Sequence, residues 1–234
     1  MPTVPPGIFA EAPVPSFAWD EPNFLQYCYF LPAALHDRLL GLTENANLAL
    51  AIGSADWILA RFLPFDPARE ARDFAAAVWA KLSPDWRCDL YDPADEDWCG
   101  PVRGPILIAM TILYDVLAGR GENSVTADRA VWMHNLALHV IEPLQPYLAW
   151  HEQVVKRLEQ THSWAIEGGR KPGLFDDEFP RGRRIGPTVL DLAVSYDPAS
   201  AAQELDQFVQ RERRNGNPFV LDPSELPDPH GHEH

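Results

Sequence analysis

The chain has 234 residues and a formal charge of −15, from 19 Lys and Arg against 34 Asp and Glu. Nucleic-acid affinity depends on Lys and Arg that displace counterions from phosphates, so this balance disfavours a nucleic-acid partner and an anionic membrane surface. Three cysteines, an odd number without CxxC spacing, favour a reducing compartment over a disulfide framework.

Targeting and membrane signals are weak in this sequence. The first residues, MPTVPPGIFAEAPVPSF, contain no Lys or Arg and no apolar run of signal-peptide length. The longest apolar run, Ile106 to Leu113, is interrupted only by Thr111 and is far shorter than the ~20 residues of a membrane span. We therefore expect a soluble, cytoplasmic protein without a membrane partner.

Residues 1–22 are rich in proline and show no periodicity. Phe9, Phe17 and Trp19 are spaced along this segment, and aromatic side chains gain free energy by burial. The segment is predicted to be an extended arm that lies on the folded domain.

Two predicted helices follow the arm. Residues 23–41 carry spaced leucines, and Pro32 is expected to break or restart this helix. Residues 44–62 place apolar side chains at i, i+3, i+4 and i+7, which is typical of a helix with one buried face. Pro64 is expected to end it.

Two Asp-Pro pairs predict further helix starts. Asp66 is expected to cap the free N–H groups of a helix whose first turn holds Pro67. That helix ends before Pro84, and the pair Asp197 and Pro198 predicts the final helix in the same way.

The middle of the chain alternates helices and loops. Residues 83–103 are expected to be irregular, and a nearly all-apolar helix over 104–118 is expected to cross the core. The remaining expected elements are a helix from Thr126 or Asp128 to Glu142, a helix over about 147–164, a loop over 167–187 and a short strand or helix over 188–194.

These patterns predict an all-α protein with about seven or eight helices and at most one minor strand. The helices are expected to form a single globular domain over residues 23–216. The Pro-rich arm of residues 1–22 precedes it, and residues 217–234 are expected to form an extended or disordered tail that is acidic and rich in His.

The most specific local motif is Arg129-Ala-Val-Trp-Met-His134, near the start of a predicted helix. It resembles the RxxxxH signature of HEPN-type ribonucleases, which are all-α bundles and cleave RNA without a metal. The resemblance covers six residues and implies that Arg129 stabilises the scissile phosphate while His134 acts as acid or base. The alternative is that Arg129 is a surface residue and His134 a half-buried helix residue.

The densest carboxylate cluster lies within residues 86–98 and is flanked by aromatic side chains. Its spacing fits no EF-hand loop, which needs Gly and Glu at fixed positions. One interpretation is a solvated loop, and the other is a docking surface in which Trp and Tyr provide most of the binding energy. The candidate partner-binding residues are Trp86, Asp89, Tyr91, Asp92, Asp95, Glu96, Asp97 and Trp98.

No metal or cofactor site is predicted. Cys88 and Cys99 are eleven residues apart, which fits no standard zinc ligand pair. The tail histidines follow several prolines without a rigid scaffold, and no P-loop or GxGxxG motif occurs. A basic cluster, Arg181, Arg183 and Arg184, lies in a Gly-rich loop where guanidinium groups are suited to carboxylate or phosphate. Its role stays open.

Two hypotheses follow. The first is a non-catalytic protein-binding module, of the immunity protein, antitoxin or regulatory-subunit type in bacteria, that draws a basic protein partner to its acidic, aromatic-rich surface. The second is a HEPN-like, metal-independent ribonuclease that uses Arg129 and His134. The absence of established catalytic motifs favours the first.

Overall fold

The computed structural model describes residues 4–11, 13–67, 69–89, 91, 98–118, 123–168 and 181–222. Within these residues the chain is an all-α arrangement of eight α-helices with very little strand, as predicted. The α-helices are α1 (Leu25–Cys28), α2 (Ala33–Leu40), α3 (Glu44–Phe62), α4 (Glu70–Val78), α5 (Gly100–Ala118), α6 (Asn123–Val140), α7 (Gln145–Thr161) and α8 (Ala201–Arg214). Three short 3-10 helices are η1 (Glu21–Asn23), η2 (Trp79–Leu82) and η4 (Pro187–Leu190).

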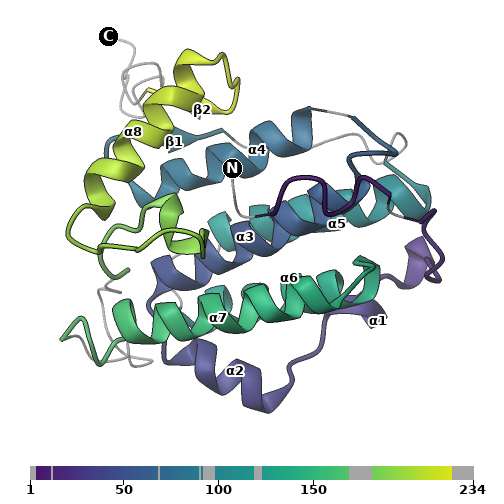
Figure 1. Ribbon diagram of the computed structural model, residues 1–234, viewed down its shortest axis with the longest axis horizontal. Helices are drawn as coiled ribbons and strands as arrows, with labels where there is room; N and C mark the ends of the chain where they lie inside the picture. Colours follow the sequence, from purple (N-terminus) through teal and green to yellow (C-terminus); the bar gives the residue numbers. More distant parts are fainter. Residues whose placement is uncertain are drawn as a thin grey trace, which may run out of the picture.

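Helix α3 is the centre of the fold. It contacts α4, α5, α6 and α7, and Figure 1 shows it between α4 and α7. All of its residues except Asp56 and Ala60 are buried. Small residues allow this close packing: a Cβ atom on Gly53 would lie 2.8 Å from the Trp150 ring. Thr43 caps the helix by accepting a hydrogen bond from the backbone N–H of Ala46.

Helix α5 is apolar enough, by length and composition, to cross a membrane. In this fold it packs against α3, α4 and α6, and 56% of its most apolar window is buried, as in the core helix of a soluble protein. The apolar sequence of α5 is therefore explained by its position in the helical core.

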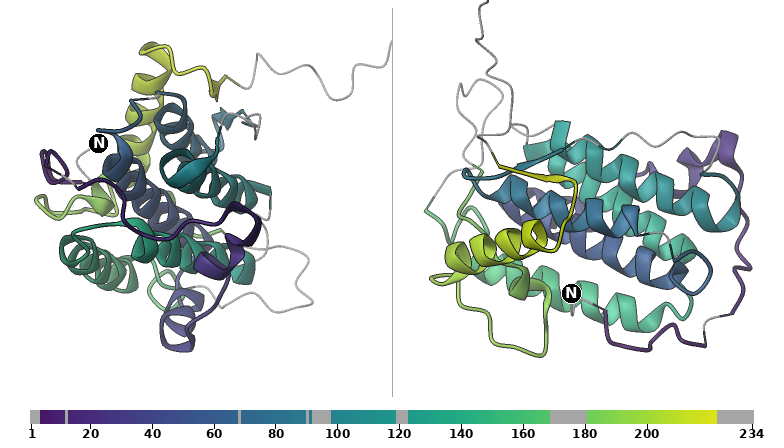
Figure 2. Two further views of the ribbon diagram at one scale, coloured as in Figure 1. Left: turned by 90° about the vertical axis from the view of Figure 1, so that its right-hand side faces the viewer. Right: turned by 90° about the horizontal axis from the view of Figure 1, so that it is seen from above.

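The N-terminal arm lies along α3, as the sequence predicted. Phe9 is buried against the edge of Trp57, at a ring-centroid distance of 6.0 Å. Farther along, the Pro13 carbonyl accepts a hydrogen bond from Arg61, and Phe17 packs on Phe62. The two views of Figure 2 show the arm following the outside of the bundle.

Both predicted Asp-Pro helix starts are wrong by several residues. Helix α4 begins at Glu70, and no side chain caps it. Asp66 instead accepts a hydrogen bond from Arg103 of α5, at 2.6 Å. Helix α8 begins at Ala201, while Asp197 accepts from the backbone N–H of Ala199 in a local turn.

The segment predicted to be irregular contains two structured parts. Its last residues belong to α5, which begins at Gly100. Near its start, strand β1 (Arg87–Cys88) pairs antiparallel with β2 (Val220–Leu221), so that Cys88 faces Val220. Residues 217–222 therefore pack on the body, with Asn217 and Val220 buried. The rest of the predicted tail lies outside the described residues.

Candidate functional site

Arg129 and His134 have different surroundings on α6. The Arg129 guanidinium lies 3.9 Å from the Trp132 ring centroid, and its Nε is 3.5 Å from Asp115. At ~100° per residue, the five-residue spacing turns the helix by roughly 140° beyond a full turn, so the two side chains leave it on different faces.

His134 belongs to a buried polar cluster in the core. Its Nδ1 is hydrogen-bonded to the Tyr147 hydroxyl at 2.9 Å, and its ring centroid lies 4.0 Å from that of His151. Tyr147 in turn donates to Ser54 at 3.2 Å. Burial lowers the pKa of His134 to about 4, and burial together with His134 lowers the pKa of His151 well below its usual value. Both rings are therefore neutral at pH 7.

Two aromatic residues of the predicted docking segment, Trp98 and Tyr91, make contacts within the protein itself. Trp98 is only 6% exposed and packs beneath the guanidinium of Arg103. The Tyr91 hydroxyl donates to Glu70 at 2.7 Å, while its ring packs on Phe219. Trp98 therefore has almost no surface left for a partner.

Two residues of that segment are better placed for binding. Asp89 is exposed, and Trp86 is partly exposed and lines a pocket. The carboxylates Asp92, Asp95, Glu96 and Asp97 lie outside the described residues, so the acidic docking surface stays a prediction.

The pocket beside Trp86 has a volume of about 470 Å³ and is lined mainly by polar and cationic side chains. We call it the cationic pocket. Three separate parts of the chain meet there: the start of α3, the end of η2 with the segment after it, and the loop before η4. Its lining residues are Asn45, Lys81, Leu82, Ser83, Pro84, Trp86, Arg87, Arg181, Gly182 and Arg184.

Asn45 fixes the loop that supplies two of these arginines. Its Nδ2 donates to the carbonyl oxygens of Gly182 and Arg183, both at 3.0 Å, and its backbone N–H donates to the carbonyl of Arg181 at 2.9 Å. Gly182 has a φ of +87° and approaches Thr43 so closely that a Cβ atom would lie 2.5 Å from the Thr43 Cβ. Asn45 thus ties residues 181–183 to the first turn of α3 through three hydrogen bonds.

Arg184 connects the arginine loop to the segment after η2 and to α8. Its two terminal nitrogens contact Asp206 of α8 at 3.2 Å and Asp85 at 3.4 Å. Ser83 donates to the second oxygen of Asp206 at 3.1 Å and accepts from the backbone N–H of Asp85. This network orients the guanidinium, in the way that supporting hydrogen bonds fix binding groups elsewhere.

The charge of the cationic pocket is opposite to that of the whole chain. Among its described lining residues, Lys81, Arg87, Arg181 and Arg184 are positive and none is negative. Carboxylates pair with two of the arginines: Glu44 is 4.0 Å from Arg181, and Arg184 contacts Asp85 and Asp206. Arg181 nevertheless keeps 54% of its side chain exposed.

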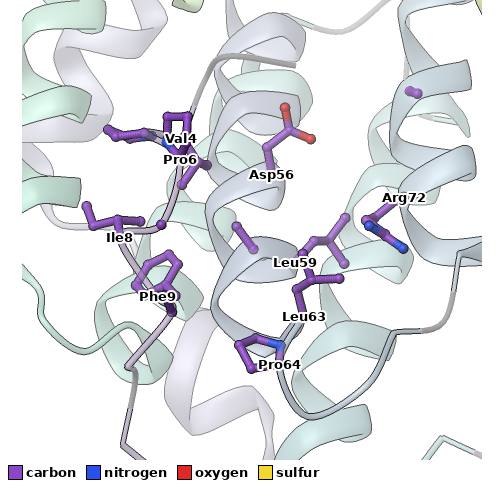
Figure 3. Close-up of a pocket in the computed structure, with 14 residues that line it drawn as sticks. Val4, Pro6, Ile8, Phe9, Asp56, Leu59, Leu63, Pro64 and Arg72 are labelled. Carbon is purple, nitrogen blue, oxygen red and sulfur yellow. The ribbon is translucent and has the colours of Figure 1, made fainter.

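A second cavity, of about 480 Å³, lies between the N-terminal arm and helices α3 and α4. Figure 3 shows Ile8 and Phe9 of the arm on one side and Leu59 and Leu63 on the other. Its charged residues are one acid, Asp56, and one base, Arg72. Because the lining is mainly apolar and its charges balance, this groove does not select a ligand by charge.

Arg183 does not line the cationic pocket, and its Nε lies 3.7 Å from Glu167 in a separate polar network. Fully buried His162 is hydrogen-bonded through Nδ1 to Glu167 at 2.8 Å and through Nε2 to the Tyr196 hydroxyl at 2.7 Å. Glu167 also accepts from the backbone N–H of Arg183 at 2.7 Å. Burial is the main cause that raises the pKa of Tyr196, which keeps its hydroxyl neutral. The network joins the end of α7 to the arginine loop.

Within the described residues, no group of three His, Cys, Asp or Glu side chains is placed to hold a metal ion. No protein-family model, curated protein or solved structure matches this chain. The cationic pocket is the strongest candidate site, and the sequence pointed to it only in part. Arg181, Arg184 and Trp86 belong to motifs that the sequence analysis identified. Asn45 and Lys81 belong to no motif in the sequence.

Proposed function

We propose that this protein binds a small anionic ligand, bearing phosphate or carboxylate, in the cationic pocket. The observation that carries the proposal is the meeting of Lys81, Arg87, Arg181 and Arg184 at one cavity of a chain whose net charge is −15. Arg181 and Arg184 also pair with carboxylates, yet 54% of the Arg181 side chain stays exposed. The concentration of these cations around a hollow gives an anion a favourable local potential.

The form of the site supports this function. Its volume of about 470 Å³ lies in the range of ~300–1,000 Å³ typical of small-molecule pockets. Guanidinium groups bind carboxylate and phosphate through paired, charge-assisted hydrogen bonds. The loop that carries Arg181 is already ordered by Asn45, so binding does not have to order it.

The test is calorimetric titration with phosphate, pyrophosphate and citrate at low ionic strength. We expect saturable binding that weakens as salt is added, because the site is partly exposed. Removing one charge with Arg181→Gln should weaken binding by about 10- to 100-fold, since a hydrogen bond to a charged group contributes ~1.5–3 kcal/mol. Arg211→Gln is the matched control, because Arg211 lies in the last turn of α8 and is 58% exposed.

Two results would refute the proposal. One is the absence of saturable binding for all three anions. The other is equal affinity in the wild type and in Arg181→Gln, which would place the anion somewhere else on the molecule.

A separate proposal concerns the acidic docking surface. We propose that a basic protein partner binds there, and that this chain acts as an immunity protein, an antitoxin or a regulatory subunit in the bacterial cytoplasm. Its support is the net charge of −15 and the exposed Asp89 beside the acidic segment. A pull-down at low and high salt tests it, with Asp92, Asp95 and Asp97 changed to Asn and Glu96 to Gln. A partner retained equally by this variant would remove the segment from the proposal.

A further inference from the structure

Trp86 differs from the other tryptophans of the chain. Of the eight, Trp57, Trp79, Trp98, Trp150 and Trp164 are buried, and only three are partly exposed. Trp19 stacks on Tyr27 at a centroid distance of 5.5 Å, and Trp132 stacks on Tyr29 at 3.9 Å. Among the residues that the structure describes, Trp86 has neither a ring nor a cation against it.

The cationic pocket combines apolar and cationic side chains. Its apolar lining, Leu82, Pro84 and Trp86, comes from residues 81–87, which also supply two of the four cations. Arg181 and Arg184 come from the loop before η4, which is a different part of the chain. A ligand that satisfies both parts has a planar apolar ring joined to an anionic group.

We infer that the ligand is a single nucleotide whose base stacks on Trp86 while its phosphate is bound by Arg181 and Arg184. This inference rests on the proposed anion-binding function and names the ligand class of the same site. Every nucleobase has a π-face that stacks on an aromatic side chain. The indole is therefore suited to the base, and the guanidinium groups are suited to the phosphate.

A mononucleotide fits better than a nucleic-acid strand. The cavity of about 470 Å³ is sized for one small ligand. A strand would bring further phosphates across the surface of a protein whose net charge is −15, and those phosphates would be repelled.

The experiment compares AMP with ribose 5-phosphate, which share the sugar and the phosphate and differ in the base. Titration of the full chain should show AMP binding roughly ten- to 100-fold more tightly, the gain expected for one stacked base. Trp86→Ala should reduce AMP affinity to that of ribose 5-phosphate, and Trp86→Phe should keep most of the difference. Arg181→Gln should weaken both ligands by a similar factor.

Because Trp86→Ala could fail to fold, base stacking is also measured by NMR on the wild-type chain. The adenine protons of bound AMP should move upfield in NMR spectra, because they lie over an indole ring. Equal affinity for AMP and ribose 5-phosphate would overturn the nucleotide inference and leave the anion-binding function standing. Failure of both ligands to bind would refute the function itself. A short single-stranded DNA that binds more tightly than AMP would also overturn the mononucleotide inference.

Discussion

Asn45 donates a 3.0 Å hydrogen bond from its side chain to the carbonyl oxygen of Gly182, a residue 137 positions later in the sequence. The contact joins the first turn of the central helix α3 to the loop that carries Arg181 and Arg184. The rigidity of the cationic pocket therefore depends on the most buried helix of the fold.

Asn45→Ala should weaken both the fold and the site. The substitution leaves the carbonyls of Gly182 and Arg183 without this donor, and two hydrogen bonds of ~0.5–1.5 kcal/mol each suggest a loss of about 1–3 kcal/mol in unfolding free energy. Urea unfolding measures that loss, and titration with phosphate measures the loss of affinity. Asn215→Ala, at an exposed position after α8, is the control. Unchanged phosphate affinity in Asn45→Ala would contradict the role of this contact.

Gly182→Ala should displace the arginine loop. Its φ of +87° disfavours any side chain by ~1–2 kcal/mol, and the new Cβ would collide with Thr43 as well. Gly216→Ala provides a matched comparison, because Gly216 has a φ of +78° and nothing within 4 Å of an added Cβ. Thermal unfolding should therefore show a larger loss of stability for Gly182→Ala, and only this variant should lose anion binding. Equal behaviour of the two variants would show that the contact with Thr43 is unimportant.

Stability should fall as the pH drops from about 6.5 to about 4, in part because of His134. The unfolded chain takes up a proton on this residue near pH 6.5, whereas burial holds the pKa of the folded form at about 4. Above pH 6.5 the ring is neutral in both the folded and the unfolded chain, so His134 costs no stability there. By pH 4, protonation of the unfolded chain lowers the unfolding free energy by about 3 kcal/mol.

Urea unfolding at pH 7.5 and pH 5.0 measures this dependence. His134→Asn should show a smaller difference between the two pH values, since the variant keeps only the contributions of His151 and of the carboxylates. The same difference in the wild type and in the variant would rule out His134 as a source of the acid sensitivity.

Arg61→Met should leave the protein equally stable or make it more stable. The guanidinium is fully buried, donates to Pro13 and lies over the rings of Phe62 and Phe65, but Nε and Nη1 have no hydrogen-bond partner among the described residues. An apolar side chain of similar volume removes this incompletely satisfied charge, a kind of change that is often neutral or stabilising by ~1–4 kcal/mol. Denaturant unfolding compares it with Arg69→Met, where the side chain is 65% exposed and little change is expected. A large destabilisation in Arg61→Met would show that the charge is needed to hold the arm.

Some elements could be predicted from the sequence because their causes are local. Helix α3 begins at Glu44 and ends at Phe62, the bounds that apolar spacing and Pro64 indicated. Pro32 separates α1 from α2 for the equally local reason that proline cannot continue a helix. The extended arm was also predictable, since its aromatic residues require a surface to pack on.

Other features depend on partners that are distant in sequence. Asp66 looked like a helix cap, but Arg103 of α5 binds its carboxylate, so α4 begins later. The pairing of β1 with β2 involves two residues on each side, too few to produce a periodic pattern.

The sequence by itself determined the helical class, the position of the central helix and the excess of negative charge, because periodicity and composition are properties of neighbouring residues. Only the tertiary structure decided that Lys81, Arg87 and Arg181 share one cavity with Trp86, and that His134 lies buried against Tyr147. Packing sets the distances between side chains far apart in the chain, and those distances determine which charges act together on a ligand.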